Sequence, residues 1–319
     1  DEEMKNVFLG CAAAALGAIA LPATAQTAAI VAASTNTANA QTEPRFTDPR
    51  DKIMATGLFT QVDIINATGI GDGTGTPSLA TLMQYDAVIV WSNASFVDSV
   101  EMGDVLADYV DAGGGVVVAL FANTTTSVNR NLAGRWQDAM GGYIAIPQGG
   151  GFTTNTTVSI GEVPDPNHPI MNGVEIFVND VGIGTNGPFG AWRPTNPTLT
   201  AGSTLVARYT DGKTLIAVAP NPRVVELGFH PVSSAVNDGY WNETTDGGLI
   251  MANALLFAAG LTGGECLPDV NGDGMVTPAD FSAWVAAFNS NAPECDQNQD
   301  GMCTPADFSA WVANYNAGC

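Results

Sequence analysis

The chain has 319 residues, of which 45% are hydrophobic, enough to bury the core of one medium-sized domain and a smaller module. It carries 32 acidic against 10 basic side chains, a formal net charge of -22. This charge repels nucleic-acid phosphates and anionic membrane surfaces, so we expect neither as a partner, and cations are the natural counterparts.

The first 25 residues are typical of an export signal. Met4 and Lys5 give a short positive start, residues 7–21 form an apolar, Ala-rich run, and Pro22-Ala23-Thr24-Ala25 ends in a small-x-small cleavage pattern. The run is shorter than the roughly 20 residues that a membrane-spanning helix needs. We therefore expect residues 1–25 to be removed. The mature protein is then exported, extracellular or cell-surface associated, and has no membrane span.

Residues 26–260 alternate strand and helix patterns. Apolar, β-branched runs that do not alternate with polar residues predict buried strands, and apolar residues at helical spacing predict helices. Asp48 is the expected N-cap of the first helix, with Pro49 at its first position. The βαβα order predicts a doubly wound, mostly parallel α/β sheet of the flavodoxin-like kind. In chain order we expect a strand at 28–33, a helix at 48–58, a strand at 61–65, a helix at 77–83, a strand at 85–91, a helix at 99–112 and a strand at 116–121.

The rest of this region is irregular until close to its end. Residues 123–197 are rich in Gly, Asn, Thr and Pro, which predicts long loops with short strands. Asp211-Gly212 is then a hairpin turn signal between two apolar runs. The expected elements are strands at 204–209 and 214–219, a strand at 224–229 and a helix at 246–259, followed by a linker at 261–265 and a C-terminal module at 266–319.

Four phrases within residues 28–260 are similar to those of a known superfamily. They are Asp111–Val117 (DAGGGVV), Asn167–Val174 (NHPIMNGV), Leu227–Pro231 (LGFHP) and Asn253–Phe257 (NALLF). With these phrases the region resembles the class I glutamine amidotransferase-like superfamily, and especially its trehalose-utilisation-type branch. The resemblance implies the same α/β fold that the strand and helix pattern predicts.

The resemblance also implies a catalytic Cys on the turn after the strand at 116–121, with a His and a Glu behind it. Ala122-Asn123-Thr124 follows that strand, and residues 26–260 contain no cysteine. His230 matches the family's His, but Val232-Ser233 stands where the Glu is usual. A His without a nucleophile to deprotonate has no triad role. We therefore predict that the domain is not an amidotransferase, and we assign no catalytic residue.

A ligand cleft is the function that we consider for this domain instead. His230, Asp238, Trp241 and Glu243 follow a strand end, where ligands of such sheets bind, and carboxylates beside an aromatic ring suit a carbohydrate. The competing interpretation of His230 is a structural residue at the strand end. Two alternatives stay open for the whole protein: an extracellular carbohydrate-active hydrolase that uses carboxylate chemistry, and a structural cell-surface component.

Two acidic loops, each followed by the same ten-residue segment, make up most of the C-terminal module. Residues 277–286 are identical to residues 304–313 (TPADFSAWVA). Each loop has oxygen side chains at positions 1, 3, 5, 9 and 12, a Gly at position 6 and a Met carbonyl at position 7, which is the calcium-loop spacing of an EF-hand. We therefore predict two calcium ions, held by Asp269, Asn271, Asp273, Met275, Thr277 and Asp280 in the first loop and by Asp296, Asn298, Asp300, Met302, Thr304 and Asp307 in the second.

A helix is expected after each loop and none before it. Pro278 and Pro305 suit the first helical position. Loop-plus-helix twice, with Asp in place of Glu at position 12, resembles a dockerin, and the ending Gly318-Cys319 resembles the variant that closes exported bacterial proteins with Gly-Cys. Each helix presents one apolar face: Phe281, Trp284, Val285 and Phe288 on the first, and Phe308, Trp311, Val312 and Tyr315 on the second.

The dockerin resemblance implies a cohesin-like or other surface docking protein as the partner. Loop positions 10 and 11 are Pro278-Ala279 and Pro305-Ala306, which offer no hydroxyl to a cellulosomal cohesin. Surface anchoring therefore fits at least as well. The whole sequence predicts an exported modular protein in which an α/β domain that binds a carbohydrate or another small molecule is carried on a calcium-dependent docking or anchoring module.

Four cysteines lie in the module, and an even number in a small exported unit indicates disulfides. A zinc site is the alternative, but the spacing lacks a CxxC pair and no His lies nearby. Three pairings are open. We favour Cys266–Cys319, which would join the two ends of the module, and Cys295–Cys303, which would brace the second loop.

Overall fold

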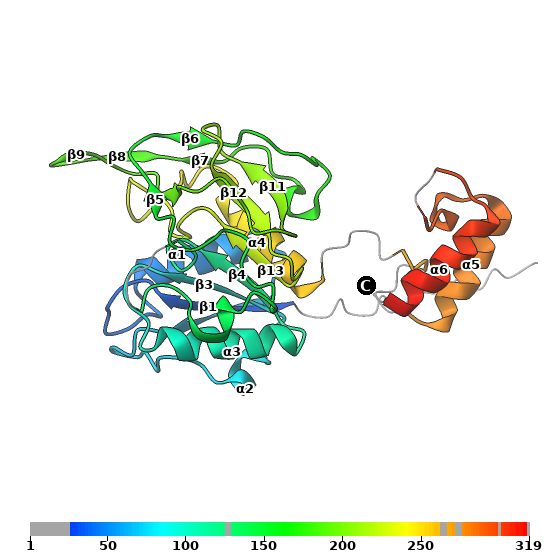
Figure 1. Cartoon of the computed structure of the whole chain (residues 1–319), viewed down its shortest axis with the longest axis horizontal. Coiled ribbons are helices and arrows are strands. Elements are labelled where there is room, and N and C mark those ends of the chain that lie inside the picture. The colour runs from blue at the N-terminus through cyan, green and yellow to red at the C-terminus, as the bar shows by residue number, and fades with distance from the viewer. Residues whose placement is uncertain (1–25, 125–128, 262–266, 272–275, 299–300, 318–319) are drawn as a thin grey trace, which may run out of the picture.

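The computed structural model describes residues 26–124, 129–261, 267–271, 276–298 and 301–317 (Figure 1). The predicted export signal lies outside these residues. An α/β body and a pair of C-terminal helices are separate units in the ribbon (Figure 1). No helix of the described ranges is long and apolar enough to cross a bilayer.

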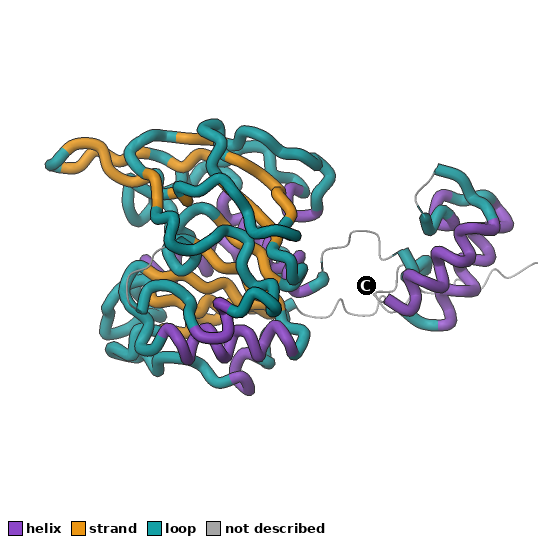
Figure 2. Tube along the Cα trace, viewed as in Figure 1, coloured by secondary structure: helices purple, strands orange, loops and turns teal. Residues whose placement is uncertain are grey.

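One seven-stranded sheet forms the centre of the α/β body (Figure 2). Its strand order is β11-β12-β13-β4-β3-β1-β2, parallel from β13 to β2, with β11 and β12 added in antiparallel pairs at one side. The expected mostly parallel α/β fold is confirmed. The strands are β1 (Thr27–Ala33), β2 (Gln61–Asn66), β3 (Ala87–Ser92), β4 (Gly115–Ala119), β11 (Thr204–Arg208), β12 (Thr214–Val218) and β13 (Val224–Leu227).

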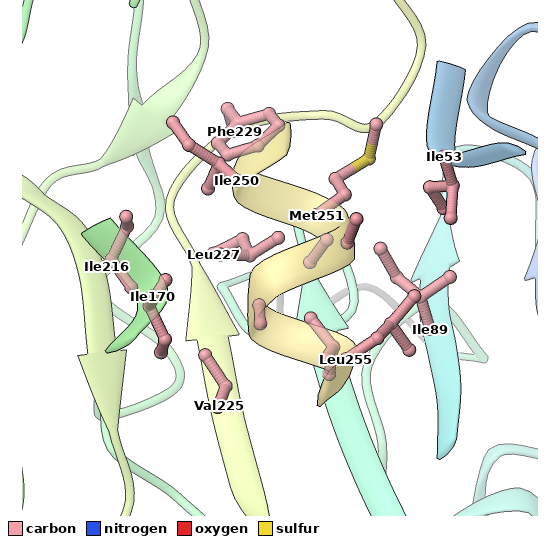
Figure 3. Close-up of a cluster of buried hydrophobic side chains, with 14 of the residues drawn as sticks. Ile53, Ile89, Ile170, Ile216, Val225, Leu227, Phe229, Ile250, Met251 and Leu255 are labelled. Atoms are coloured by element: carbon pink, nitrogen blue, oxygen red, sulfur yellow. The ribbon is translucent and has the colours of Figure 1, made fainter. Parts of the chain in front are cut away.

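Helices cover both faces of this sheet, which is why its strands are apolar on both sides. Within β1, Ile30 packs into the core under α1 (Pro44–Met54) and α4 (Gly247–Ala259), whereas Val31 packs into the core under α2 (Leu79–Leu82) and α3 (Ser99–Asp111). Figure 3 shows Met251 and Leu255 of α4 in one apolar cluster with Ile53 of α1 and Ile89 of β3. Continuous apolar strands are what such double coverage requires.

The segment between β4 and β11 has little regular structure, as its composition predicted. Its short strands pair locally, and the β8–β9 hairpin extends from the body (Figure 1). Its elements are η1 (Gly134–Gln137), β5 (Phe152–Thr153), β6 (Val158–Ser159), η2 (Pro169–Met171), β7 (Val178–Asn179), β8 (Val181–Gly184), β9 (Gly187–Gly190) and β10 (Arg193–Pro194).

The first helix begins earlier than the sequence predicted. Its N-cap is Glu43, and Pro44 takes the first position, so Pro49 lies inside the helix and the expected cap at Asp48 is wrong. Both prolines suit a first turn, and the sequence alone does not separate them. Pro49 has no N–H for the carbonyl four residues earlier, and Ser34 Oγ donates to that Arg45 carbonyl instead, at 2.9 Å.

Two other elements also have boundaries that differ from those predicted. The expected helix at 77–83 shortens to α2, which Ser78 caps by accepting the N–H of Thr81. The expected strand at 116–121 ends at Ala119, so Leu120 and Phe121 extend beyond β4. This places the Phe121 side chain at the edge of the sheet and not within it.

The C-terminal module contains α5 (Pro278–Ser290), η3 (Pro293–Cys295) and α6 (Pro305–Ala317). Both helices begin at the prolines that the sequence assigned to the first position. Their apolar faces meet with the symmetry of the repeat: Phe281 packs on Trp311 with ring centroids 5.1 Å apart, and Trp284 packs on Phe308 at 5.6 Å. The disulfide Cys295–Cys303 is present. Cys266 and Cys319 lie outside the described residues.

Candidate functional site

Three strand ends bring the candidate site together. Trp91 lies near the end of β3, Phe121 follows β4 and His230 follows β13. The backbone keeps these ends adjacent, since the Phe121 N–H donates to Ser92 O at 3.1 Å and the Leu120 N–H donates to Phe229 O at 3.2 Å. The carboxyl ends of parallel strands meet at one sheet edge, the usual place for ligands in such folds.

Phe121 contacts three other rings of an aromatic cluster at this edge. Its ring centroid lies 5.7 Å from that of His230, 6.1 Å from that of Trp192 and 5.2 Å from that of Phe152. Tyr240 stacks on the other side of the cluster, 4.6 Å from His230 and nearly parallel to it. His230 is 3% exposed, whereas Phe152 is 45% exposed. The cluster therefore runs from the core to the surface.

His230 is held as a neutral ring with its proton on Nε2. Its Nδ1 accepts the N–H of Val232 at 3.2 Å, so in the neutral imidazole the proton is on the other nitrogen. Burial, together with the charges of Arg130 and Arg45, lowers the pKa of His230 to about 3. At neutral pH the ring therefore presents an N–H donor, and this Nε2 has no hydrogen-bond partner among the described residues.

Two more buried donors at this edge lack an acceptor. Trp91 Nε1 and Arg130 Nε are both without a partner within the described part of the chain. Arg130 lies with its guanidinium carbon 5.3 Å from the centroid of Phe121, and its Nη2 donates to Asn93 Oδ1 at 3.1 Å. A buried N–H without a partner costs about 1–3 kcal/mol. Three such donors in one cluster fit a ligand that supplies acceptor oxygens.

The position where the superfamily carries its nucleophile holds no nucleophile here. Asn123 is buried, and its amide donates to Leu227 O at 3.3 Å. Thr124 Oγ1 is buried without a partner in the described structure, so no base is there to activate it. The absence of amidotransferase chemistry stays a prediction from the sequence.

Glu226, on β13 close to Asn123, is a buried acid that the sequence analysis did not single out. Its Oε1 accepts the N–H of Ala145 at 2.8 Å. Burial raises its pKa to about 8, against the opposing effect of the Ala145 and Ile146 N–H groups and the Asn123 amide. Glu226 is therefore mostly protonated at neutral pH. The signal for it was available: it is the one charged residue in the apolar run Val224–Phe229.

The four residues expected to line a cleft do not come together. Only His230 belongs to the aromatic cluster, whereas Asp238 is exposed. Trp241 is buried in the core, where its Nε1 donates to Pro231 O at 2.9 Å. Glu243 forms an ion pair with Lys52 of α1, with Oε2 and Nζ 3.1 Å apart. The neighbouring Tyr240 contacts His230 where Trp241 was expected.

A groove of 670 Å3 lies elsewhere, between α4, the end of α1 and the turn at 166–173. Its lining includes Asn253, whose amide donates to Ile170 O and Asn172 O at 3.1 and 2.8 Å. The Asn167–Val174 phrase thus has a structural role, since α4 binds its carbonyls. No buried side-chain donor without a partner lines this groove within the described residues. The aromatic cluster is therefore the stronger candidate.

In the C-terminal module, the residue at position 12 of each predicted calcium loop is fully buried. Asp280 accepts the N–H groups of Thr277 at 2.8 Å and Asn271 at 3.2 Å. Asp307 is also fully buried. Each carboxylate therefore ties the start of its loop to the first turn of the following helix.

Asp307 accepts three backbone donors from the described residues. The N–H groups of Thr304, Gln297 and Asn298 reach it at 2.7, 3.0 and 3.2 Å. Burial alone would raise the pKa of Asp307, but these hydrogen bonds outweigh it and the pKa is lowered. Asp307 is therefore ionised at neutral pH although it is buried.

The remaining predicted ligands are only partly described. Asp273, Met275 and Asp300 lie outside the described residues, and no group of three acidic, His or Cys side chains able to hold a metal occurs among those that are described. From Glu265 onward the sequence has eight acidic residues and no Lys or Arg. Buried carboxylates in a unit without cations of its own are chemically suited to a hard divalent ion such as calcium.

Comparison with known proteins finds 49 chains of solved structures that are similar to this chain, two of which are described here. One is a ThuA-like protein from Bacteroides uniformis, with 16% identity and a TM-score of 0.48, covering 76% of this chain and 95% of that one. The other is the cytoplasmic protein STM1381 from Salmonella typhimurium, with 12% identity and a TM-score of 0.42, covering 64% of this chain and 87% of that one. No protein-family model and no curated protein matches.

Proposed function

We propose that the protein is an exported, modular carbohydrate-binding protein, with the sugar held by the aromatic cluster around His230. The observation that supports this most is the set of three buried donors, beside aromatic faces, for which the described part of the chain provides no acceptor. Sugars offer hydroxyl and ring oxygens to such donors and apolar C–H faces to aromatic rings. A few fixed polar groups in an apolar wall are typical of small-molecule sites.

An enzymatic role receives less support. Glycoside hydrolysis uses two carboxyl groups about 5–9.5 Å apart on either side of the bond. Of the acidic residues first considered, Asp238 is exposed and Glu243 is paired with Lys52. Glu226 is a protonated acid at neutral pH, but the described structure brings no second carboxylate to it as a partner. Binding without turnover is therefore the function that we favour.

The C-terminal module would supply calcium-dependent docking. Asp269, Asn271, Asp273, Thr277 and Asp280, with the Met275 carbonyl, would hold one ion, and the corresponding residues of the second repeat would hold the other. Bound calcium would neutralise the acidic loops. The partner would be a cohesin-like or other surface protein. Support comes from the repeated loop spacing, the buried Asp280 and Asp307, and the absence of Lys and Arg after residue 265.

The two histidines provide a matched test of the sugar site. His168 Nδ1 accepts the N–H of Ile170 at 3.2 Å, as His230 Nδ1 does from Val232, but His168 packs on Phe257 outside the cluster. We expect His230→Phe to weaken binding about tenfold, because it keeps the ring and removes one donor. His168→Phe should leave binding unchanged. Tryptophan fluorescence of the mature chain against a saccharide panel measures both.

If no saccharide in the panel binds the mature chain, or if both histidine variants change its affinity equally, the proposed sugar site is wrong. Docking is tested separately, by capture of surface proteins from the producing cells with calcium and then with a chelator. Equal capture in the two conditions would contradict a calcium-dependent module. Cell fractionation with and without chelator then distinguishes a docked binding protein from a structural surface component.

A further inference from the structure

Arg130 differs from the other arginines that the structure describes. Five of them face a carboxylate, and Arg223 donates to the carbonyls of Ala258 and Ala259 at the end of α4. Among the described residues, Arg130 has the amide oxygen of Asn93 as its one side-chain hydrogen-bond partner and forms no ion pair. In a chain with 32 acidic residues, a half-buried guanidinium without a counter-ion leaves room for an anionic ligand.

The surroundings of Arg130 favour an anion as well. Arg45, in the first turn of α1, is close enough to act electrostatically on both His230 and Tyr240. Two of the ten basic residues of a strongly acidic protein therefore act at one edge of the sheet, where three N–H donors also lack acceptors among the residues that the structure describes.

Aromatic rings lead outward from these donors. Trp192 lies on the outer side of Phe121 and contacts Phe189 of β9, with ring centroids 6.3 Å apart. Phe152 is 45% exposed beside them. We call Phe152, Trp192 and Phe189 the outer strip. Successive rings on a surface suit successive sugar units better than they suit a single compact anion.

We infer that the site takes an acidic oligosaccharide by its end: a terminal uronate places its carboxylate on Arg130, with the N–H groups of His230 and Trp91 on its oxygens, and the following sugar rings lie on the outer strip. Arginine suits this task because its planar guanidinium can donate two parallel hydrogen bonds to the two oxygens of a carboxylate. The inference rests on the proposed sugar site. It adds that the ligand is acidic and that it binds by its terminal residue.

The test compares ligands that differ only in their carboxylates. Uronate trisaccharides of galacto, gluco and manno configuration are each titrated beside their carboxyl-reduced, neutral forms into the mature chain by calorimetry. We expect at least one uronate to bind about tenfold tighter than its reduced form. Arg130→Gln should abolish that preference. Arg208→Gln, which removes a surface partner of Glu162, is the arginine control.

The outcomes separate this inference from the proposed function. Equal affinity for acidic and reduced sugars, unchanged by Arg130→Gln, overturns the uronate inference and leaves the sugar site standing. Acetate or inorganic phosphate binding as tightly as the best uronate also overturns it. The absence of binding to any saccharide overturns the proposed function itself. If Arg130→Gln does not fold, Arg130→Lys replaces it in the test. Lysine keeps the positive charge but lacks the planar guanidinium. The inference then requires that Arg130→Lys lower the preference for the uronate over its reduced form.

Discussion

The two histidines show what a residue's immediate sequence determines and what it does not. Each precedes a proline, and in each the Nδ1 atom accepts the N–H two residues further on. This local turn sets the same tautomer in both rings. Their surroundings differ: His168 is half-buried near Asp165, whereas His230 is enclosed by aromatic rings and two arginines. The His-Pro phrase therefore predicts the ring's proton position, and only the fold decides whether that proton serves a ligand.

Glu226 offers a prediction about pH. Its pKa is raised to about 8 in the folded chain, above its ordinary value of 4.5. Between these values the folded chain holds a proton that the unfolded chain has released, so the stabilisation from protonated Glu226 is lost as the pH rises. The unfolding free energy of the wild type should fall between about pH 5 and about pH 8. In Glu226→Gln this fall should be smaller by at least 1 kcal/mol, which is roughly the free energy that corresponds to one pKa unit.

Thermal unfolding of both chains at the two pH values measures this difference. The exposed Glu175→Gln is the matched control and should follow the wild type, because it replaces a carboxylate at the surface and not in the core. Parallel pH profiles for Glu226→Gln and the wild type would show that Glu226 is ionised in the folded chain.

At the scale of elements, α1 depends on a side chain from another segment. Pro49 leaves the Arg45 carbonyl without its helical donor, and Ser34 Oγ, fully buried, supplies one. We expect Ser34→Ala to cost about 1–2 kcal/mol, because it leaves a buried acceptor unsatisfied. In a Pro49→Ala background the helix regains an N–H for that carbonyl, and the cost should fall by at least half. A double-mutant cycle by chemical denaturation measures the coupling; a cost that does not change would refute it.

The paired helices of the module allow a comparison inside one chain. Trp284 and Trp311 occupy equivalent positions, but Trp284 Nε1 donates to Cys295 O at 3.1 Å, whereas Trp311 Nε1 is buried without a partner among the described residues. Trp284→Phe should therefore destabilise the module by about 1 kcal/mol more than Trp311→Phe. Denaturation of the full chain, followed by far-UV circular dichroism, measures both. Equal losses would mean that the hydrogen bond contributes nothing net.

Most elements could be predicted from the sequence, because parallel strands covered on both faces must be apolar throughout. The start of α1 could not, since Pro44 and Pro49 fit a first turn equally well. The site was harder still. His230 carried a motif, but Trp91 and Phe121 come from two other strand ends and Arg130 from the loop before η1, and only the fold brings them together. Within one loop, the sequence favoured Trp241 over its neighbour Tyr240 as the aromatic residue of the site, but the Trp241 side chain is buried in the core.

At the scale of the whole molecule, the α/β body keeps a fold suited to ligand chemistry without a nucleophile in the expected place. Glutamine hydrolysis needs a thiolate, a base and an oxyanion site. Residues 26–260 contain no cysteine, and Asn123 and Thr124 stand at the turn after β4. We expect no ammonia release from glutamine by the mature protein and no labelling by a glutamine-analogue electrophile. Stoichiometric labelling within residues 118–126 would overturn this.

The acidic charge of the chain is expected to couple calcium to one of its two units. From residue 265 onward the acidic side chains have no Lys or Arg to offset them, and a unit of this size buries little core by itself. An ion that binds only the folded loops stabilises them by about 4 kcal/mol at a thousand times its dissociation constant. The α/β body contains neither loop. Calcium should therefore act on the module and leave the body unchanged.

Scanning calorimetry of the full mature chain measures this. We expect two transitions, of which only the one assigned to the module rises when calcium replaces a chelator. Asp269→Ala combined with Asp296→Ala should abolish the rise, because both loops lose the ligand at position 1. Magnesium at equal concentration controls for ionic screening and should shift the transition much less, since it demands a smaller, octahedral site. Identical traces in calcium and in excess chelator would contradict the calcium module while leaving the aromatic cluster and its proposed ligand untouched.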